Sequence, residues 1–352
     1  MRLFRCRACG QTVFFENSIC GNCGHALGFL AGGQEMLTLT QQGDLYRRVR
    51  SLQRFRYCEN ASHNACNWLI PAGSPEKFCA ACRYNRTIPD LSIPQHLTPW
   101  QRMEIAKHRL FYTLLALRLP MRSYADDPEH GLAFDFLPDP PGPGPRILTG
   151  HDEGLITINL AEANDAMREK FRTEMGEPYR TLLGHFRHET GHYFWNILLR
   201  DTGRLVGFRA MFGDETQDYG EALQRHYEDG PPPDWEQNYI SAYAASHPWE
   251  DFAESWAHYL HIIDTLETAS AFGLRIHPGA GSHKLLRASI TFDPHRVTAI
   301  EQLVAAWLPL TVAVNSLNRS MGLADLYPFT LAPNVIEKLG FIHHLAHQPM
   351  PT

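Results

Sequence analysis

Apolar side chains recur along this chain with the period of helices in some segments and the period of strands in others. Residues 100–119 place apolar side chains three or four positions apart, which predicts a helix. Thr98 would be its N-cap, Pro99 would lie in its first turn, and Pro120 would end it. The helical period returns in three later segments, residues 235–267, 297–317 and 335–345. The predicted fold class is α+β, with a mainly helical C-terminal part and a small sheet.

A strand is predicted at residues 154–160, where apolar and polar side chains alternate. It lies shortly before the segment that carries the histidines described below. At the edge of a sheet, such a strand could pair with the extended backbone of a peptide. A purely structural strand would show the same alternation, so the sequence leaves both roles open.

All eight cysteines lie in the first 82 residues. Cys6 pairs with Cys9 and Cys20 pairs with Cys23, and ten residues separate the two pairs. Two such knuckles can bring four thiolates to one tetrahedral zinc ion, which is the arrangement of a zinc ribbon. A disulfide or an iron site of the rubredoxin kind could use the same residues, but short cysteine pairs in a cytosolic chain more often bind zinc.

A second zinc site is predicted from the four remaining cysteines, Cys58, Cys66, Cys79 and Cys82. The first two are separated by seven residues, and His63 could replace either of them as a ligand. A segment this small has too little core to fold unaided, and bound zinc would supply the missing free energy. We therefore predict two structural zinc ions, in modules that span residues 1–30 and 31–94.

The central motif is His188-Glu189-x-x-His192, which lies in an apolar stretch. Side chains four residues apart share one face of a helix, so His188 and His192 can both bind a single zinc ion. Glu189 would then lie beside the open coordination position and could act as general base toward a water molecule. So short a pattern also arises by chance, so the prediction depends on a third ligand.

The third ligand must come from elsewhere in the chain, because Leu198 occupies the position where a longer histidine motif would continue. Glu250 and Glu254 lie four residues apart, and two carboxylates on one helical face repel each other unless a cation lies between them. We predict that Glu250 binds the metal and that Glu254 accepts a hydrogen bond from a ligand histidine. Asp251 or Glu254 could be the ligand instead.

These motifs resemble those of zincin metallopeptidases with a glutamate ligand, the gluzincins. The form His-Glu-x-Gly-His, joined to a Glu-x-x-x-Glu helix, is similar to the catalytic domains of anthrax-lethal-factor-like peptidases and Pro-Pro endopeptidases. That resemblance implies that Glu250 is the ligand, that Glu254 supports a histidine, and that Tyr243 assists the oxyanion. Through residues 179–193 and 248–255, the chain also resembles bacterial zinc-binding metallopeptidases that carry an N-terminal zinc-ribbon domain.

The predicted function is zinc-dependent peptide hydrolysis by a zincin-like domain at residues 95–352, with Glu189 as general base and one catalytic zinc ion. An alternative is an interaction protein, whose zinc ribbons bind protein or nucleic acid and whose zincin domain is inactive. A third possibility is a hydrolase that cleaves an amide bond other than a peptide bond.

The charge and hydropathy of the chain limit the classes of partner that it could bind. The net charge of −6 argues against a general binder of nucleic acid or anionic membranes. A basic run includes Arg47, Arg48, Arg50, Arg54 and Arg56. It could contact nucleic acid or an acidic partner, but we favour a solvated helix face.

No apolar run of about 18 residues and no signal-peptide core are evident, so we expect a cytoplasmic protein that acts on a protein or peptide.

Overall fold

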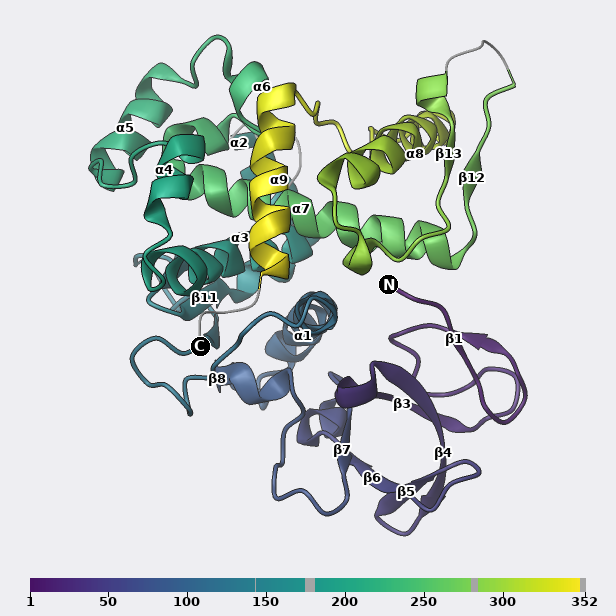
Figure 1. Ribbon diagram of the computed structural model, residues 1–352. Coiled ribbons are helices and arrows are strands. Elements are labelled where there is room, and N and C mark those ends of the chain that lie inside the picture. Colours follow the sequence, from purple (N-terminus) through teal and green to yellow (C-terminus); the bar gives the residue numbers. More distant parts are fainter. Residues whose placement is uncertain (143, 175–180, 280–283, 349–352) are drawn as a thin grey trace. The chain divides into compact units, whose positions relative to one another are not determined.

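The computed structural model describes every residue except 143, 175–180, 280–283 and 349–352. Residues 179 and 180 of the resemblance therefore lie outside the described residues. The chain forms two compact units, Met1–Met167 and Arg168–Thr352, which are described separately. Strands dominate the early, purple part of the chain and helices the later, green to yellow part (Figure 1), so the predicted α+β class is confirmed. The domain boundaries predicted after residues 30 and 94 stay predictions.

The first unit contains an antiparallel sheet of five strands in the order β3-β4-β5-β6-β7. The strands are β3 (Ala26–Leu30), β4 (Glu35–Gln42), β5 (Leu45–Arg48), β6 (Arg54–Tyr57) and β7 (Leu69–Pro71). Shorter elements around them are β1 (Phe4–Arg5), β2 (Thr12–Val13), η1 (Ala31–Gly33), η2 (Glu59–His63) and η3 (Cys82–Tyr84). The sheet buries a core of Leu37, Leu39, Phe55 and Leu69. This sheet and the loops that carry the eight cysteines together form the part of the first unit that precedes helix α1 (Pro94–Ala116).

The basic run lies on strands β5 and β6 and the turn between them, so the prediction of a solvated helix face is wrong. The two strands pair antiparallel with each other within the five-stranded sheet, which makes this segment extended rather than helical. Arg48 donates two hydrogen bonds of 3.0 Å to the carboxylate of Glu35. Arg56 donates a hydrogen bond of 3.0 Å to the backbone oxygen of Ser74. Two of the arginines therefore serve the structure of the module itself.

Helix α1 (Pro94–Ala116) is longer than predicted, because it begins at Pro94 and not after Thr98. Pro99 lies inside the helix, so Thr98 is not the N-cap. The helix buries Trp100 and Met103 completely. A proline such as Pro99 by itself suggests the start of a helix. Burial of the apolar face stabilises a helix that includes this position and extends to both sides of it.

A four-stranded sheet completes the first unit, in the order β10-β11-β9-β8. Its strands are β8 (Asn85–Thr87), β9 (Ala133–Leu137), β10 (Gly150–Asp152) and β11 (Leu155–Asn159), followed by η4 (Leu160–Ala163) and α2 (Asp165–Glu174). Strand β11 pairs with β10 on one side and with β9 on the other. Of the two roles left open for this strand, the structure favours the structural one, because both backbone edges of β11 are already paired.

The second unit is built mainly of helices in the described part of the chain. Its α-helices are α3 (Leu182–Trp195), α4 (Leu205–Phe212), α5 (Tyr219–Asp229), α6 (Trp235–Asn238), α7 (Pro248–Ala271), α8 (Ile300–Ser320) and α9 (Pro333–His347). Its shorter elements are the π-helix η5 (Asn196–Arg200), η6 (Tyr243–Ser246), η7 (Lys284–Leu286), η8 (Pro294–Arg296), β12 (Arg275–Ile276) and β13 (Ala288–Ser289). Helix α7 is the centre of this unit, because α3, α4, α8 and α9 all pack against it (Figure 1).

Helices α3 and α7 approach each other closely at Gly191. A Cβ atom at this position would lie only 2.8 Å from the Cα atom of Ala253, which leaves no room for a larger residue. Near this point the rings of Phe194 and Trp256 stack with their centroids 4.8 Å apart. Pro248 occupies the first turn of α7, where its missing N–H needs no partner. The two helices are thereby fixed face to face.

Helix α8 is the one helix, among those the structure describes, that is long and apolar enough to cross a membrane. It buries Leu303, Trp307 and Leu310 and packs against α7, as the core helix of a soluble protein does. Such a helix passes the same test of length and composition as a membrane span. One helix of this kind is therefore weak evidence for a membrane span.

Candidate metal centres and active site

Three side chains from α3 and α7 converge on one point. The hydroxyl of Thr181 accepts a hydrogen bond of 3.0 Å from the backbone N–H of Gly184 and so begins α3. One turn separates His188 from His192, whose Nε2 atoms lie 3.2 Å apart. The Glu250 Oε2 atom lies 3.0 Å from Nε2 of His188 and 3.6 Å from Nε2 of His192. These three donor atoms form a group that could hold a metal ion.

Glu250 fits a metal site better than a purely structural one. Its Oε2 atom is buried and makes no hydrogen bond with the described residues, although two imidazole nitrogens face it. Its Oε1 atom accepts a hydrogen bond of 2.7 Å from the hydroxyl of Tyr219. Burial raises the pKa of Glu250, but His192 and His188 outweigh burial and hold that pKa well below its usual range. A charged oxygen aimed between two rings is the donor that a cation needs.

Glu254 holds the other side of the same histidine. Its Oε1 atom lies 2.7 Å from Nδ1 of His188, and its Oε2 atom accepts a hydrogen bond of 2.7 Å from Ser241. Burial opposes ionisation of Glu254, but the hydrogen bond to His188 prevails and lowers its pKa to about 2. Burial likewise opposes protonation of His188, yet Glu250 and Glu254 raise its pKa well above the usual value. The two carboxylates beside His188 therefore stabilise positive charge at this point, which protons or a divalent cation can supply.

Asp251, the other residue considered as a ligand, lies in a separate ion pair. Its Oδ2 atom is 2.6 Å from Nζ of Lys338 on α9. Burial raises the pKa of Asp251 to about 7, and the ammonium group of Lys338 limits that rise. Glu254 contacts the Nδ1 atom of His188 rather than the point where the three donors meet. Of the three acidic candidates, Glu250 is the one grouped with both histidines.

Glu189 and Tyr243 both lie near this group of donors. Glu189 lies on α3 next to His188, with 9% of its surface exposed. The charge of Glu189 is among the lesser causes, behind burial, that raise the pKa of Tyr243. The ring of Tyr243 lies 6.0 Å from that of His188, measured between centroids. Trp249 packs on His192 with centroids 3.7 Å apart and so restricts that ring.

The first cysteine cluster brings together Cys6, Cys9, Cys20 and Cys23. The Sγ atoms of Cys6 and Cys23 lie 3.6 Å apart, and those of Cys9 and Cys20 lie 3.7 Å apart. A zinc–sulfur bond of about 2.3 Å gives a tetrahedral edge of about 3.8 Å, whereas a disulfide bond is about 2.05 Å long. None of the eight cysteines forms a disulfide bond in the structure, and the sulfur separations fit a zinc–thiolate site better than a disulfide. Glycines with positive φ, Gly10 and Gly24, close the knuckles.

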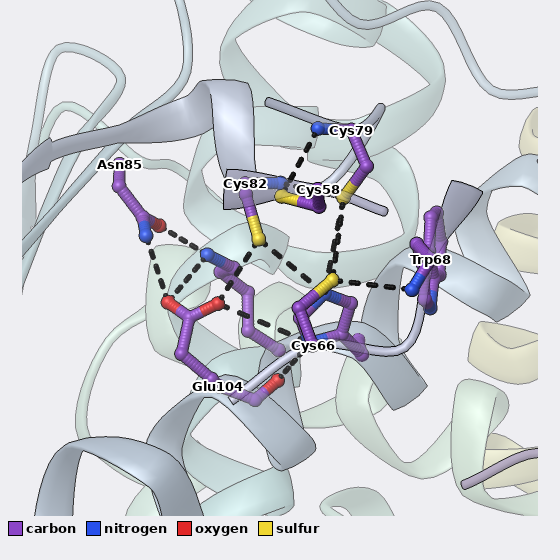
Figure 2. Close-up of polar contacts among 9 residues, drawn as sticks. Cys58, Cys66, Trp68, Cys79, Cys82, Asn85 and Glu104 are labelled. Carbon is purple, nitrogen blue, oxygen red and sulfur yellow. Dashed lines mark hydrogen bonds and ion pairs between the residues drawn. The ribbon is translucent and has the colours of Figure 1, made fainter. Parts of the chain in front are cut away.

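The second predicted cluster, Cys58, Cys66, Cys79 and Cys82, also gathers around one point. Figure 2 shows these sulfurs turned toward one another, and those of Cys66 and Cys79 lie 3.8 Å apart. His63, the predicted alternative, packs its ring edge-on against Trp100, with centroids 5.9 Å apart. The histidine that contacts these sulfurs is His108 of α1, whose Nε2 atom lies 3.2 Å from Sγ of Cys66.

Three residues of these sites were not predicted from the sequence: Tyr219, Ser241 and His108. Tyr219 and Ser241 each support a glutamate of the α7 pair, from 31 and 13 residues upstream. No spacing rule connects residues in separate elements, so the pattern of the sequence holds no signal for them. His108 lies in the helix predicted at residues 100–119. The one signal that the sequence offered was the presence of a histidine in a helix with an apolar face.

The two histidines of α3 and the glutamate of α7 form a group of the kind that a helical His-Glu-x-x-His motif contributes to metal-dependent hydrolases. A family model described as "putative zinc-binding metallo-peptidase" matches residues 96–345, and the chain belongs to that family. A second model, for a zinc-ribbon domain, matches residues 3–93. Metallopeptidase activity and zinc binding are the properties that these families indicate.

Relatives extend along the whole chain. Uncharacterized proteins of Mycobacterium bovis and of two Mycobacterium tuberculosis strains are each 42% identical to it over 354 residues. Each comparison covers 100% of this chain and 97% of the relative. No solved structure matches this protein. The similarity thus extends over both segments of this chain that the family models match.

Proposed function

We propose that this protein is a zinc-dependent peptidase of the gluzincin type, in which His188, His192 and Glu250 hold the catalytic ion. The observation that carries the proposal is the convergence of these donor atoms, with Glu250 Oε2 3.0 and 3.6 Å from the two imidazole nitrogens. Two histidines and one glutamate leave a fourth position for water, as catalytic zinc sites require. Glu189, next to His188 on the same helix, supplies the base that such a reaction needs.

The chemistry is addition of water across a peptide bond. Zinc bound here would polarise the scissile carbonyl and lower the pKa of a water molecule to about 7. The carboxylate of Glu189 takes the proton from that water as its oxygen attacks the carbonyl carbon. Glu189 then returns the proton to the amine nitrogen as the carbon–nitrogen bond breaks. The products are a carboxylate and a free amine.

Tyr243 is the residue proposed to stabilise the oxyanion. Burial raises the pKa of its phenol well above 10, so the hydroxyl keeps its proton at neutral pH and can donate a hydrogen bond. Tyr219 and Glu254 are positioning residues, because each acts through a proposed ligand, Glu250 or His188. Their role is to hold the ligands in place before substrate arrives.

We also propose two structural zinc ions, one in each cysteine cluster, which gives three ions per chain. The separations of 3.6, 3.7 and 3.8 Å between sulfurs support this number, because they match the edge of a zinc–thiolate tetrahedron. Eight free thiols are typical of a reducing compartment, which supports a cytoplasmic location. The proposed partner is a protein or peptide substrate.

The experiment that tests the proposed function combines Glu189→Gln with a metal count. Wild type and variant are incubated with a peptide library and a matched library of other amides, and products are identified by mass spectrometry. Glu236→Gln, an exposed glutamate on α6, is the matched control. We expect Glu189→Gln to keep its zinc and to lose about 10²–10⁴-fold in peptide hydrolysis, because it lacks the general base.

Each other outcome decides against part of the proposal. Activity of Glu189→Gln within about tenfold of wild type rejects Glu189 as the base. Cleavage of other amides without cleavage of peptides rejects peptidase activity. A wild-type protein that binds zinc in the cysteine clusters alone, and cleaves neither library, favours an interaction protein.

A further inference from the structure

The second cysteine cluster is faced by a fifth donor, which comes from helix α1. The Nε2 atom of His108 lies 3.2 Å from Sγ of Cys66, 3.5 Å from Sγ of Cys82 and 4.0 Å from Sγ of Cys79. The ring is buried, with 5% of the residue exposed. A single buried nitrogen therefore lies near three of the four sulfurs at once.

These separations are those of ligands around one ion. Bond lengths of about 2.3 Å for zinc–sulfur and about 2.0–2.1 Å for zinc–nitrogen place a sulfur and a nitrogen about 3.5 Å apart in a tetrahedral site. The three distances from His108 lie around this value, and the distance of 3.8 Å between Cys66 and Cys79 fits the sulfur–sulfur edge. An imidazole packed only for its apolar surface has no reason to adopt these distances.

The orientation of the ring points to the same role. The Nδ1 atom of His108 lies 2.6 Å from the backbone oxygen of Glu104 and donates its hydrogen to it. In a neutral imidazole the other nitrogen then carries the lone pair, so Nε2 presents that lone pair to the sulfurs. A hydrogen bond from the far nitrogen to a carbonyl is how metal-binding histidines are held.

Buried charge also favours a neutral ligand. Glu104 and Lys107 form a fully buried ion pair, with Nζ 2.8 Å from Oε1, beside the cluster. Figure 2 shows Glu104 next to Cys82, with its Oε2 atom 3.4 Å from the sulfur. Lys107 balances Glu104, so four thiolates around a divalent ion would leave a net charge of −2. Three thiolates and His108 would leave −1, and less charge is easier to bury.

We propose that His108 is a ligand of the zinc ion at the second cysteine cluster. The proposal rests on the structural zinc proposed above for that cluster. Five donors then face an ion that takes four, so one cysteine sulfur stays outside the coordination shell. The ion joins the sheet of the cysteine modules to α1, whose His108 lies within the segment that the peptidase family model matches. Zinc thereby connects the two family segments inside the first unit.

Cadmium-113 NMR of the full-length chain tests this directly, because each loaded site gives its own resonance. The second site is identified because its cadmium resonance correlates with β-protons of cysteines drawn from Cys58, Cys66, Cys79 and Cys82, and under the proposal three of the four give such correlations. We expect this resonance to correlate also with the ring protons of one histidine. That correlation should vanish and the resonance should shift in His108→Ala, whereas the control His63→Ala should change neither.

The wild-type spectrum decides the question even if His108→Ala fails to fold. Correlations to four cysteines and to no imidazole would overturn the proposal, and so would a histidine correlation that persists in His108→Ala. The absence of any cadmium resonance from these cysteines would instead overturn the structural zinc on which the proposal rests. The catalytic site is read separately, because its resonance correlates with no cysteine.

Discussion

Glu254 and Glu250 hold opposite nitrogens of the same imidazole ring, that of His188. Glu254 Oε1 lies 2.7 Å from Nδ1, and Glu250 Oε2, one helical turn earlier on α7, lies 3.0 Å from Nε2. Donation from Nδ1 to Glu254 leaves the lone pair of Nε2 directed at the point where the three donors meet. The Glu-x-x-x-Glu spacing therefore sets both the position and the tautomer of the histidine.

Removal of Glu254 should weaken the catalytic metal site without removing a ligand. We expect Glu254→Ala to lower zinc affinity about 10–100-fold, because His188 loses the acceptor that orients it. Glu254→Gln retains an acceptor oxygen and should recover part of that loss. Competition with a chelating indicator measures the affinity, with the exposed Glu301→Gln on α8 as control. Unchanged affinity in Glu254→Ala would contradict this role.

Gly191 should be intolerant of any side chain. A Cβ atom there would lie 2.8 Å from Cα of Ala253, so Gly191→Ala must push α3 away from α7. We expect a loss of about 1–3 kcal/mol in unfolding free energy, together with weaker zinc binding. Gly207→Ala on α4 is the matched control, because its Cβ would lie 3.4 Å from a ring carbon of Phe341, an ordinary contact. Equal stability of the two variants in urea would reject the close approach.

The grouping of the two α3 histidines with an α7 glutamate could be predicted, because a helix places residues that are four apart on one face. His188 and His192, like Glu250 and Glu254, are four residues apart, so sequence distance translates into geometry without knowledge of the fold. The paired cysteines are equally local. The grouping of these residues in the structure agrees with that reasoning.

The residues that sequence reasoning missed depend on tertiary packing. Tyr219 reaches Glu250 from another helix, and His108 reaches the sulfurs of cysteines 26 to 42 residues away. Local pattern also misplaced the start of α1, because burial of Trp100 extends helix past a proline. For β11, alternation indicated a strand but contained no information on which neighbours would pair with it.

The stability of the second unit should depend on pH through His258. This ring is buried, and its Nδ1 atom lies within hydrogen-bond distance, 2.7 Å, of the hydroxyl of Tyr327. Burial lowers the pKa of His258 to about 4, although the charge of Glu254 opposes that shift. Between pH of about 6.5 and 4, His258 binds a proton in the unfolded chain but stays neutral in the folded chain. The free energy of unfolding therefore falls as the pH falls.

The size of this effect follows from the lowered pKa. A shift from about 6.5 to about 4 corresponds to a loss of about 3 kcal/mol by the acid end of the window. We expect His258→Gln, whose amide can still form a hydrogen bond with Tyr327, to show a smaller decrease in unfolding free energy between pH 7 and 4.5. The exposed His344→Gln on α9 should behave as wild type. A decrease of equal size in His258→Gln would assign the pH dependence to other groups.

The central claim is that one labile zinc ion at His188, His192 and Glu250 carries the activity. The most direct measurement counts zinc per chain during treatment with a chelator while peptide hydrolysis is followed. We predict three ions, of which one is lost readily, with activity lost in proportion and restored by one equivalent of zinc. His188→Ala should bind two ions and stay inactive. Activity that survives loss of the labile ion, or a wild-type chain that binds two ions only, would contradict the claim.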